Sequence, residues 1–330
     1  MLRKAIPLMT AKKVRQDIPI PYELSLAKDC LDAALKQNLH SRDRLVVVAG
    51  PCSADNPKAV VEYCKKLALL QQKFPNLLVV ARVYTTKPHS NGQGYKGLCF
   101  QSEEGQEVDL ATGIETCRKM MMSVLQLGLP IADELLYPEL APYFVDLVSY
   151  QFVGARSSED SLHRAVASAL NVCCGIKNAT NGLISGAVNS LLAVASPCVF
   201  PCCGEVVHTG GNKFAHIVLR GGENKEGYFS NLGRESTAEA KRLLEKNGLN
   251  TFVMVDLSHA NSGKIAENQL DNARIVATDP NVDGVMIESY LYRGRAQNAY
   301  GVSKTDECID IAQTEEVLAI LSQGFASRKQ

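Results

Sequence analysis

The sequence predicts an α/β protein built as a (β/α)8 barrel (a TIM barrel) with a short N-terminal extension. Short β-branched runs alternate along the chain with longer amphipathic stretches, which is the element order of an α/β fold. Runs such as Leu45-Val-Val-Val-Ala-Gly50 lack polar alternation, and strands of this kind are buried on both faces between helices. An open doubly wound sheet shares this pattern, but no Gly-x-Gly-x-x-Gly motif follows the first strand, which favours the barrel.

Length and composition agree with one large domain. The chain has 330 residues, of which 46% are hydrophobic and 21% charged, as expected for a globular protein with a sizeable core. One barrel takes about 250 residues. We therefore expect an N-terminal extension over residues 1–40, mainly helical, and a catalytic barrel over residues 41–330.

Charge and hydropathy exclude several classes of partner. The formal net charge is zero, with 35 basic and 35 acidic residues, so no overall charge attracts nucleic acid. No apolar run reaches the length of about 18 residues that a membrane span needs, and the first residues lack the pattern of a signal peptide. The 11 cysteines have no regular spacing. We expect a reduced, cytoplasmic protein.

The expected elements follow from buried runs and capping signals. Asn56-Pro57 begins one helix with a cap and a first-turn proline, and Asn247-Gly248 ends another. The expected helices cover 57–72, 108–127, 139–149, 159–170, 183–195, 235–247 and 313–323. The expected strands cover 45–50, 77–83, 131–134, 151–155, 174–177, 251–255 and 284–287. Two further runs, 198–202 and 215–219, compete for the sixth barrel position.

Polar residues stand at the carboxyl ends of these strands. In a barrel those ends meet on one face, where active sites lie. The set comprises Cys52, Arg82, Glu134, Arg156, Lys177, Arg220, His259 and Glu288, with Asp306 in the loop beyond the last strand.

The cations of this set predict an anion site. Crowded positive charges need an anionic ligand, and guanidinium groups suit carboxylate and phosphate. We expect a small, multiply charged ligand. The cations are Arg82, Arg156, Lys177 and Arg220, together with Lys87.

The remaining donors predict a metal site. Cys52, His259, Glu288 and Asp306 offer one sulfur, one nitrogen and two oxygen ligands, a mixture that suits Mn, Fe, Co or Zn better than Mg or Ca. Taken singly, Cys52 could be a buried apolar thiol and Asp306 a helix N-cap.

Seven short motifs of the chain resemble those of a known family, the type I 3-deoxy-D-arabino-heptulosonate 7-phosphate (DAHP) synthases. The resemblance runs in order from about residue 42 to the C-terminus and is strongest to the microbial subgroup with an N-terminal extension. It rests on Gly50-Pro-Cys-Ser53, Arg82-Val-Tyr84 with Lys87-Pro88, Gly154-Ala-Arg156, Gly175-Ile-Lys-Asn178 with Thr180-Asn-Gly182, Leu219-Arg-Gly-Gly222, Ser258-His-Ala-Asn-Ser262 and Met286-Ile-Glu-Ser289.

The resemblance implies a specific reaction. The family condenses phosphoenolpyruvate with erythrose 4-phosphate and releases phosphate, the first step of the shikimate pathway to aromatic amino acids. It implies phosphoenolpyruvate binding by Arg82, Lys87, Arg156, Lys177 and Arg220. It implies a divalent metal, manganese favoured, on Cys52, His259, Glu288 and Asp306, with Lys87, His259 and Cys52 catalytic. By analogy with the family, we expect a homo-oligomer, a dimer or a tetramer.

The chain departs from the family in the loop that binds the acceptor. The family usually has Lys-Pro-Arg-Thr where this chain has Lys87-Pro-His-Ser90, and that arginine and threonine hold the phosphate of erythrose 4-phosphate. His89 offers no guanidinium fork, whereas Ser90 keeps a hydroxyl and Lys96 could supply a charge. We therefore expect either weak use of erythrose 4-phosphate or another aldehyde. A non-catalytic barrel is a third hypothesis, which the intact metal and cation sets disfavour.

Overall fold

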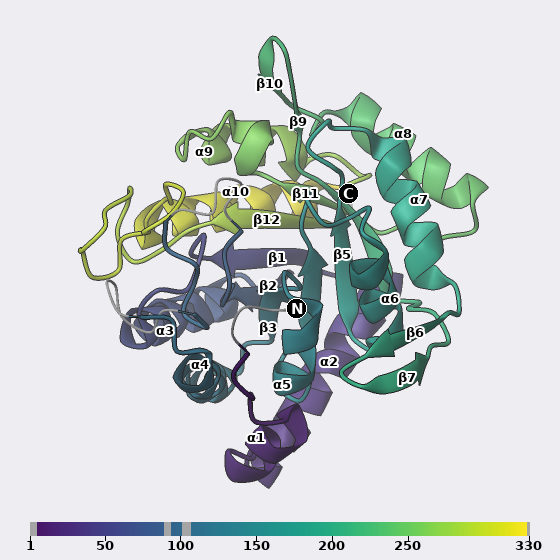
Figure 1. Cartoon of the computed structure of the whole chain (residues 1–330). Helices are drawn as coiled ribbons and strands as arrows, with labels where there is room; N and C mark the ends of the chain where they lie inside the picture. The colour runs from purple at the N-terminus through teal and green to yellow at the C-terminus, as the bar shows by residue number, and fades with distance from the viewer. Residues whose placement is uncertain (1–4, 89–93, 101–106, 329–330) are drawn as a thin grey trace.

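The chain forms a closed barrel of eight parallel strands surrounded by helices (Figure 1). The computed structural model describes residues 5–88, 94–100 and 107–328. Neighbouring strands follow the order β1-β2-β3-β4-β5-β8-β11-β12, and β12 pairs with β1 to close the barrel. The barrel strands are β1 (Leu45–Gly50), β2 (Leu77–Arg82), β3 (Ile131–Glu134), β4 (Tyr150–Val153), β5 (Cys173–Lys177), β8 (Ala215–Leu219), β11 (Val253–Asp256) and β12 (Gly284–Glu288). The predicted (β/α)8 fold is confirmed.

The helices agree closely with the capping signals of the sequence. Asn56 caps α3 by accepting hydrogen bonds from two backbone N–H groups, and Pro57 fills the first turn, as the sequence predicted. The helix expected over 139–149 is reduced to a 3-10 turn (Pro138–Leu140) and the short α5. The helices are α1 (Ala11–Asp17), α2 (Tyr22–Ser41), α3 (Pro57–Lys73), α4 (Leu110–Leu125), α5 (Ala141–Phe144), α6 (Ser161–Ala169), α7 (Ile184–Ala195), α8 (Arg234–Lys246), α9 (Asn268–Ala277) and α10 (Ile311–Ser327).

The sixth barrel position belongs to the 215–219 run, which settles the alternative left open by the sequence. β8 is buried along its whole length and lies between β5 and β11. The competing run forms β6 (Val199–Cys202), which pairs antiparallel with β7 (Glu205–His208) outside the barrel. Pro201 within β6 cannot donate a ladder hydrogen bond, so this segment is unsuited to a central strand. A second hairpin, β9 (Gly222–Asn224) with β10 (Gly227–Phe229), projects at the top of Figure 1.

One end of the barrel is covered by the helix that precedes it. Leu35 and Leu39 on α2 are buried in one cluster with the inward-facing side chains Val46, Val48 and Leu78. These side chains lie toward the amino ends of β1 and β2, so α2 covers that end. The carboxyl ends of the strands therefore form the mouth that remains for a ligand.

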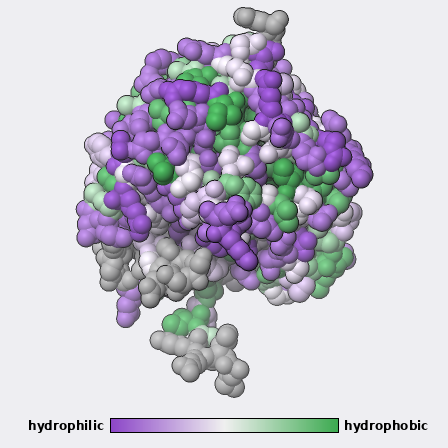
Figure 2. Space-filling model, turned by 90° about the horizontal axis from the view of Figure 1, so that it is seen from above, coloured by the Kyte–Doolittle hydropathy of each residue, from purple (hydrophilic) through white to green (hydrophobic). Residues whose placement is uncertain are grey.

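The outer surface seen from above is mostly hydrophilic (Figure 2). Apolar side chains appear there in small separate groups, which is usual for a folded protein. Within the described ranges, no helix combines the length and the apolar character needed to cross a bilayer.

The barrel interior contains one fully buried histidine. The ring of His216 lies between Tyr150 and Phe252, and its Nε2 is 2.7 Å from the Tyr150 hydroxyl oxygen. Its Nδ1 is 3.1 Å from the carbonyl oxygen of Phe214, so Nδ1–H donates there and Nε2 accepts from Tyr150. Burial lowers the pKa of His216 to about 4.

This histidine makes stability depend on pH. The unfolded chain protonates His216 below about pH 6.5, whereas the folded chain resists protonation down to about pH 4. Its contribution is therefore complete above pH 6.5 and is lost as the pH falls from 6.5 to 4, by about 3 kcal/mol at most. We expect His216→Gln to flatten the pH dependence of the free energy of unfolding in this range. His208→Gln, at an exposed site, should keep the parental slope. Equal slopes in parent and His216→Gln would contradict this.

Candidate active site

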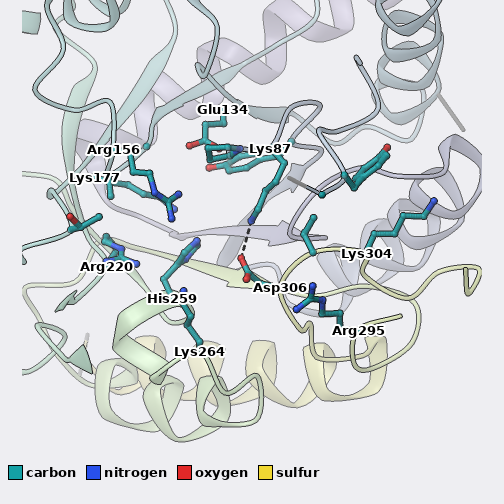
Figure 3. A pocket seen from close by; sticks show the side chains of 18 of the residues that line it. Lys87, Glu134, Arg156, Lys177, Arg220, His259, Lys264, Arg295, Lys304 and Asp306 are labelled. Atoms are coloured by element: carbon teal, nitrogen blue, oxygen red, sulfur yellow. Dashed lines mark hydrogen bonds and ion pairs between the residues drawn. The ribbon is translucent and has the colours of Figure 1, made fainter. Parts of the chain in front are cut away.

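The strand-end residues selected from the sequence meet around one cavity at the mouth of the barrel (Figure 3). The cavity has a volume of about 520 Å³. Of the predicted residues, its lining includes Arg82, Lys87, Glu134, Arg156, Lys177, Arg220, His259 and Asp306. Cys52 and Glu288 are fully or almost fully buried and contact these lining side chains.

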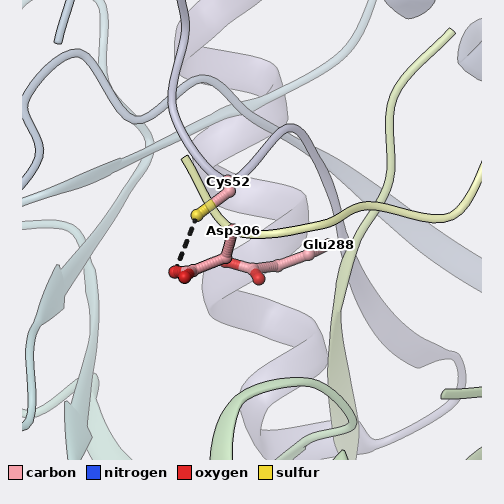
Figure 4. Close-up of side chains that lie close together, drawn as sticks. All are labelled: Cys52, Glu288 and Asp306. Atoms are coloured by element: carbon pink, nitrogen blue, oxygen red, sulfur yellow. Dashed lines mark hydrogen bonds between the residues drawn. The ribbon is translucent and has the colours of Figure 1, made fainter. Parts of the chain in front are cut away.

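Three of the predicted metal ligands lie together (Figure 4). The Cys52 sulfur and the carboxylate oxygens of Glu288 and Asp306 are all within 4.8 Å of one another. Gly50 explains how Cys52 reaches this place, since a Cβ there would lie 2.0 Å from the backbone oxygen of Arg82. Only glycine permits that close approach. Asp306 is not a helix cap, because Asp310 caps α10.

The Nε2 atom of His259, the ring nitrogen that would bind a metal, faces the cluster of Cys52, Glu288 and Asp306. This Nε2 is 3.6 Å from a Glu288 oxygen, and the Nδ1 of the same ring is 2.7 Å from Asp256. Metal-binding histidines commonly donate their other N–H to a carboxylate in this way. The His259 backbone has a φ of 54°, a strained conformation of a kind that clusters at functional sites. The donor set therefore fits a divalent cation.

Two cations lie against these donors, Arg82 buried and Lys87 partly buried. The Lys87 ammonium is 2.6 Å from the Cys52 sulfur and 2.9 Å from an Asp306 oxygen. Arg82 donates to Glu288 at 2.8 Å and to the carbonyl oxygen of Cys52 at 3.0 Å. Arg82 thus lines the cavity as predicted and also holds a metal-ligand candidate in place.

These contacts set the protonation of the donors. Burial, followed by the charge of Glu288, raises the pKa of the Cys52 thiol to about 12. Burial alone would raise the pKa of Asp306, but the ion pair with Lys87 holds it well below its ordinary value. Since thiolate is the ligand form of cysteine, a metal bound here must displace the proton of Cys52.

The opposite side of the cavity is a cationic wall formed by Arg156, Lys177 and Arg220 (Figure 3). Lys177 is paired with Asp256 at 2.9 Å. Within the described parts of the chain, neither Arg156 nor Arg220 has a carboxylate partner. Burial lowers the pKa of Arg220 below its ordinary value, the charge of Asp256 partly offsets this, and the positive charge of Arg156 adds to the lowering. This wall needs an anion, and guanidinium groups suit phosphate and carboxylate.

Asp256 is a further candidate site residue that the sequence motifs did not single out. It is fully buried and contacts the Lys177 ammonium, the His259 ring and Ser258. Burial alone would raise its pKa, but His259 and Lys177 hold it well below the ordinary value. Its signal was the spacing in Asp256-Leu-Ser-His259, which places a carboxylate at the end of β11 beside the predicted ligand.

The acceptor-binding predictions have a different outcome. His89 and Ser90 lie outside the described residues. Lys96 is exposed, its carbonyl accepts a hydrogen bond from the Lys87 backbone, and it is not in the cavity lining. Its role stays a prediction. The lining includes three cations that the sequence analysis did not select, namely Lys264, Arg295 and Lys304.

Comparison with known proteins agrees with this site. The DAHP synthetase I family matches residues 33–323. The chain is 36% identical over 312 residues to the phospho-2-dehydro-3-deoxyheptonate aldolase of Corynebacterium glutamicum, covering 87% of this chain and 83% of that one. It is 32% identical over 339 residues to the Tyr-sensitive aldolase of that name from Escherichia coli, covering 96% and 93%. A solved phospho-2-dehydro-3-deoxyheptonate aldolase from Francisella tularensis matches at a TM-score of 0.94 and 31% identity over 100% of both chains. This chain therefore belongs to the DAHP synthetase I family.

Proposed function

We propose that this enzyme, a transferase, condenses phosphoenolpyruvate with erythrose 4-phosphate to give DAHP and phosphate, the entry step of aromatic amino acid biosynthesis. One observation carries the proposal. The cationic wall of Arg156, Lys177 and Arg220, in which only Lys177 is paired with a carboxylate in the described part of the chain, faces a cluster of metal-ligand candidates across the cavity. An anionic enol phosphate fits the wall, and the aldehyde that it attacks fits the opposite side.

Different residues of the cavity bind the substrate and assist the reaction. Arg156, Lys177 and Arg220 hold the phosphate and carboxylate of phosphoenolpyruvate and direct its third carbon at the aldehyde, so the reaction becomes effectively unimolecular. Carbon–carbon bond formation places negative charge on the aldehyde oxygen. The double bond of phosphoenolpyruvate supplies the electron pair of the new bond, and water adds at the electron-poor second carbon with loss of a proton. The bond from that carbon to the phosphate oxygen then breaks as the remaining hydroxyl proton passes to phosphate, which leaves the ketone.

We infer that Lys87 supplies the proton that the aldehyde oxygen takes up. Burial lowers its pKa, but Cys52 and Asp306 outweigh burial and raise it above the ordinary value. The side chain is therefore an ammonium at neutral pH. A positioned general acid accelerates reactions by about 100-fold to 10,000-fold, and the raised pKa of Lys87 puts it toward the lower end of that range.

We infer that Cys52, His259, Glu288 and Asp306 hold a divalent metal. Their sulfur, nitrogen and oxygen donors favour manganese, with iron, cobalt or zinc as alternatives. When bound, such a metal supplies Lewis-acid polarisation of the aldehyde oxygen. Asp256 supports the site by fixing the His259 ring with Nε2 toward Glu288.

A second candidate keeps phosphoenolpyruvate and changes the aldehyde. The Lys87-Pro-His-Ser90 loop favours it, because His89 replaces the arginine that the family uses for the acceptor phosphate. A non-catalytic barrel is disfavoured, since each predicted metal ligand and each predicted phosphoenolpyruvate-binding cation stands at or beside the cavity.

Assembly and location stay predictions. A homo-oligomer is supported by large exposed apolar side chains ahead of the barrel, with Ile6 74% and Tyr22 78% exposed, because a second copy could cover them. A monomer by sedimentation would contradict this. The 11 cysteines are free thiols, which fits the reducing cytoplasm.

The proposed reaction is tested by phosphate release from phosphoenolpyruvate with a panel of aldehydes. We expect release with erythrose 4-phosphate and formation of the seven-carbon product, because both ends of the cavity bear charges suited to phosphate. Release with a different aldehyde alone would favour the second candidate. No release with any aldehyde, in protein replete with metal, would support the non-catalytic barrel.

The cationic wall is tested by removing its charges one at a time. We expect Arg156→Ala and Lys177→Ala each to lower kcat/KM for phosphoenolpyruvate by about tenfold to a hundredfold, because each loses a charge-assisted contact. Lys177→Ala should also weaken metal binding, since Asp256 loses a partner. Arg242→Ala, at an exposed site on α8, is the control. Near-parental kinetics in both wall variants would place phosphoenolpyruvate elsewhere.

The metal site is tested by chelation and by Cys52→Ser. We expect a chelator to abolish activity and Mn, Fe or Co to restore it. In Cys52→Ser, manganese affinity measured by equilibrium dialysis should fall at least about tenfold, because a serine oxygen replaces the thiolate. The unfolding midpoint should change little, and Cys30→Ser, an exposed cysteine on α2, should bind metal normally. Full turnover after exhaustive demetallation, or parental affinity in Cys52→Ser, would contradict the assignment.

A further inference from the structure

The loop between β12 and α10 carries cations into the cavity as well as Asp306. Arg295 and Lys304 both line the cavity, although eight residues of sequence lie between them. Arg295 forms a backbone bridge with Ser303, and the Ala296 N–H donates to the Ser303 carbonyl at 2.9 Å. These contacts align the two segments of the loop, so the two cations belong to one braced structure.

The two cations lie on the far side of the cavity from the cationic wall (Figure 3). Lys87 and Asp306 lie between the two groups in that view. Arg295 is exposed and forms no ion pair with a carboxylate within the ranges that the structure describes. The Lys304 ammonium lies 5.2 Å from the ring centre of Tyr95, whose hydroxyl donates to the Ala54 carbonyl at 3.1 Å. The Tyr95 ring therefore forms a fixed face beside Lys304.

This arrangement matches the charges of an acceptor with a terminal phosphate. In the proposed reaction, the phosphate and carboxylate of phosphoenolpyruvate neutralise the cationic wall. No anionic group of phosphoenolpyruvate is then left for Arg295 and Lys304, which lie beyond Lys87 and Asp306. An aldehyde held at Lys87 directs its other end away from the wall. A guanidinium fork and an ammonium are the groups that proteins use for a phosphate dianion.

We propose that Arg295 and Lys304 bind the terminal phosphate of the aldehyde acceptor and supply the charge that His89 lacks. The inference rests on the proposed condensation and names the part of the same cavity that selects a phosphorylated aldehyde. It predicts a preference for erythrose 4-phosphate over phosphate-free erythrose that depends on these two side chains.

The test compares the kinetics of Arg295→Ala, Lys304→Ala and the double variant with those of the parent, at equal metal content. The Michaelis constant for erythrose 4-phosphate should rise about tenfold in each single variant and further in the double variant, because each contact involves a charged group. The constant for phosphoenolpyruvate should stay parental. Turnover of phosphate-free erythrose should also be unaffected, and Arg295→Lys should recover part of the loss.

Arg293→Ala is the matched control, because Arg293 lies in the same loop but pairs with Glu267 and does not line the cavity. It should behave as the parent. Parental constants for erythrose 4-phosphate in the double variant would overturn the inference and leave the proposed reaction intact. Equal losses with erythrose and erythrose 4-phosphate would overturn it too, because the residues would then only shape the loop. A parent that releases no phosphate with erythrose 4-phosphate would overturn both.

Discussion

Closure of the barrel between β1 and β12 is the constraint on which the site depends. The parallel register pairs Gly50 with Glu288, and the Ser289 N–H donates to the Gly50 carbonyl at 2.9 Å. Cys52, two residues beyond Gly50, is thereby brought beside Glu288, although 235 residues separate them in the sequence. β2 pairs with the other edge of β1, so Arg82 reaches the same carboxylate. An open sheet would leave β1 and β12 at opposite edges and would separate these ligands.

Burial of so many charges is tolerated because they are paired. Burying an isolated ion destabilises the folded protein, and removing one partner of a buried ion pair is destabilising because the other charge stays buried without a partner. Arg82 is paired with Glu288, Lys87 with Asp306, and Lys177 with Asp256. Arg156 and Arg220 form no such ion pair in the described part of the chain, so their charges are available to a ligand. Lys177 belongs to both groups, because it is paired with Asp256 and also stands in the cationic wall.

The sequence predicted the barrel and most of the strand-end residues, because both depend on local signals. A buried run followed by a polar residue marks a strand end, and closure brings those ends together. The role of Asp256 was missed because its partners, Lys177 and His259, become visible only in three dimensions. The run at 198–202 was ambiguous because periodicity does not report which strand a run pairs with. Arg295 and Lys304 were missed since an irregular loop has no period to mark which side chains face inward.

The two kinds of element in the site have different consequences for specificity. The cationic wall and the metal-ligand candidates stand mostly on strand ends, where the barrel register fixes their spacing. The cations opposite the wall stand on a loop that is held by a few backbone contacts. Substituting a strand-end residue disturbs buried pairs, whereas loops tolerate substitution. A change in the acceptor loop, such as His89 in place of an arginine, can therefore be offset by another loop at the same rim. The chemistry at the barrel mouth can stay constant while the means of holding the acceptor changes.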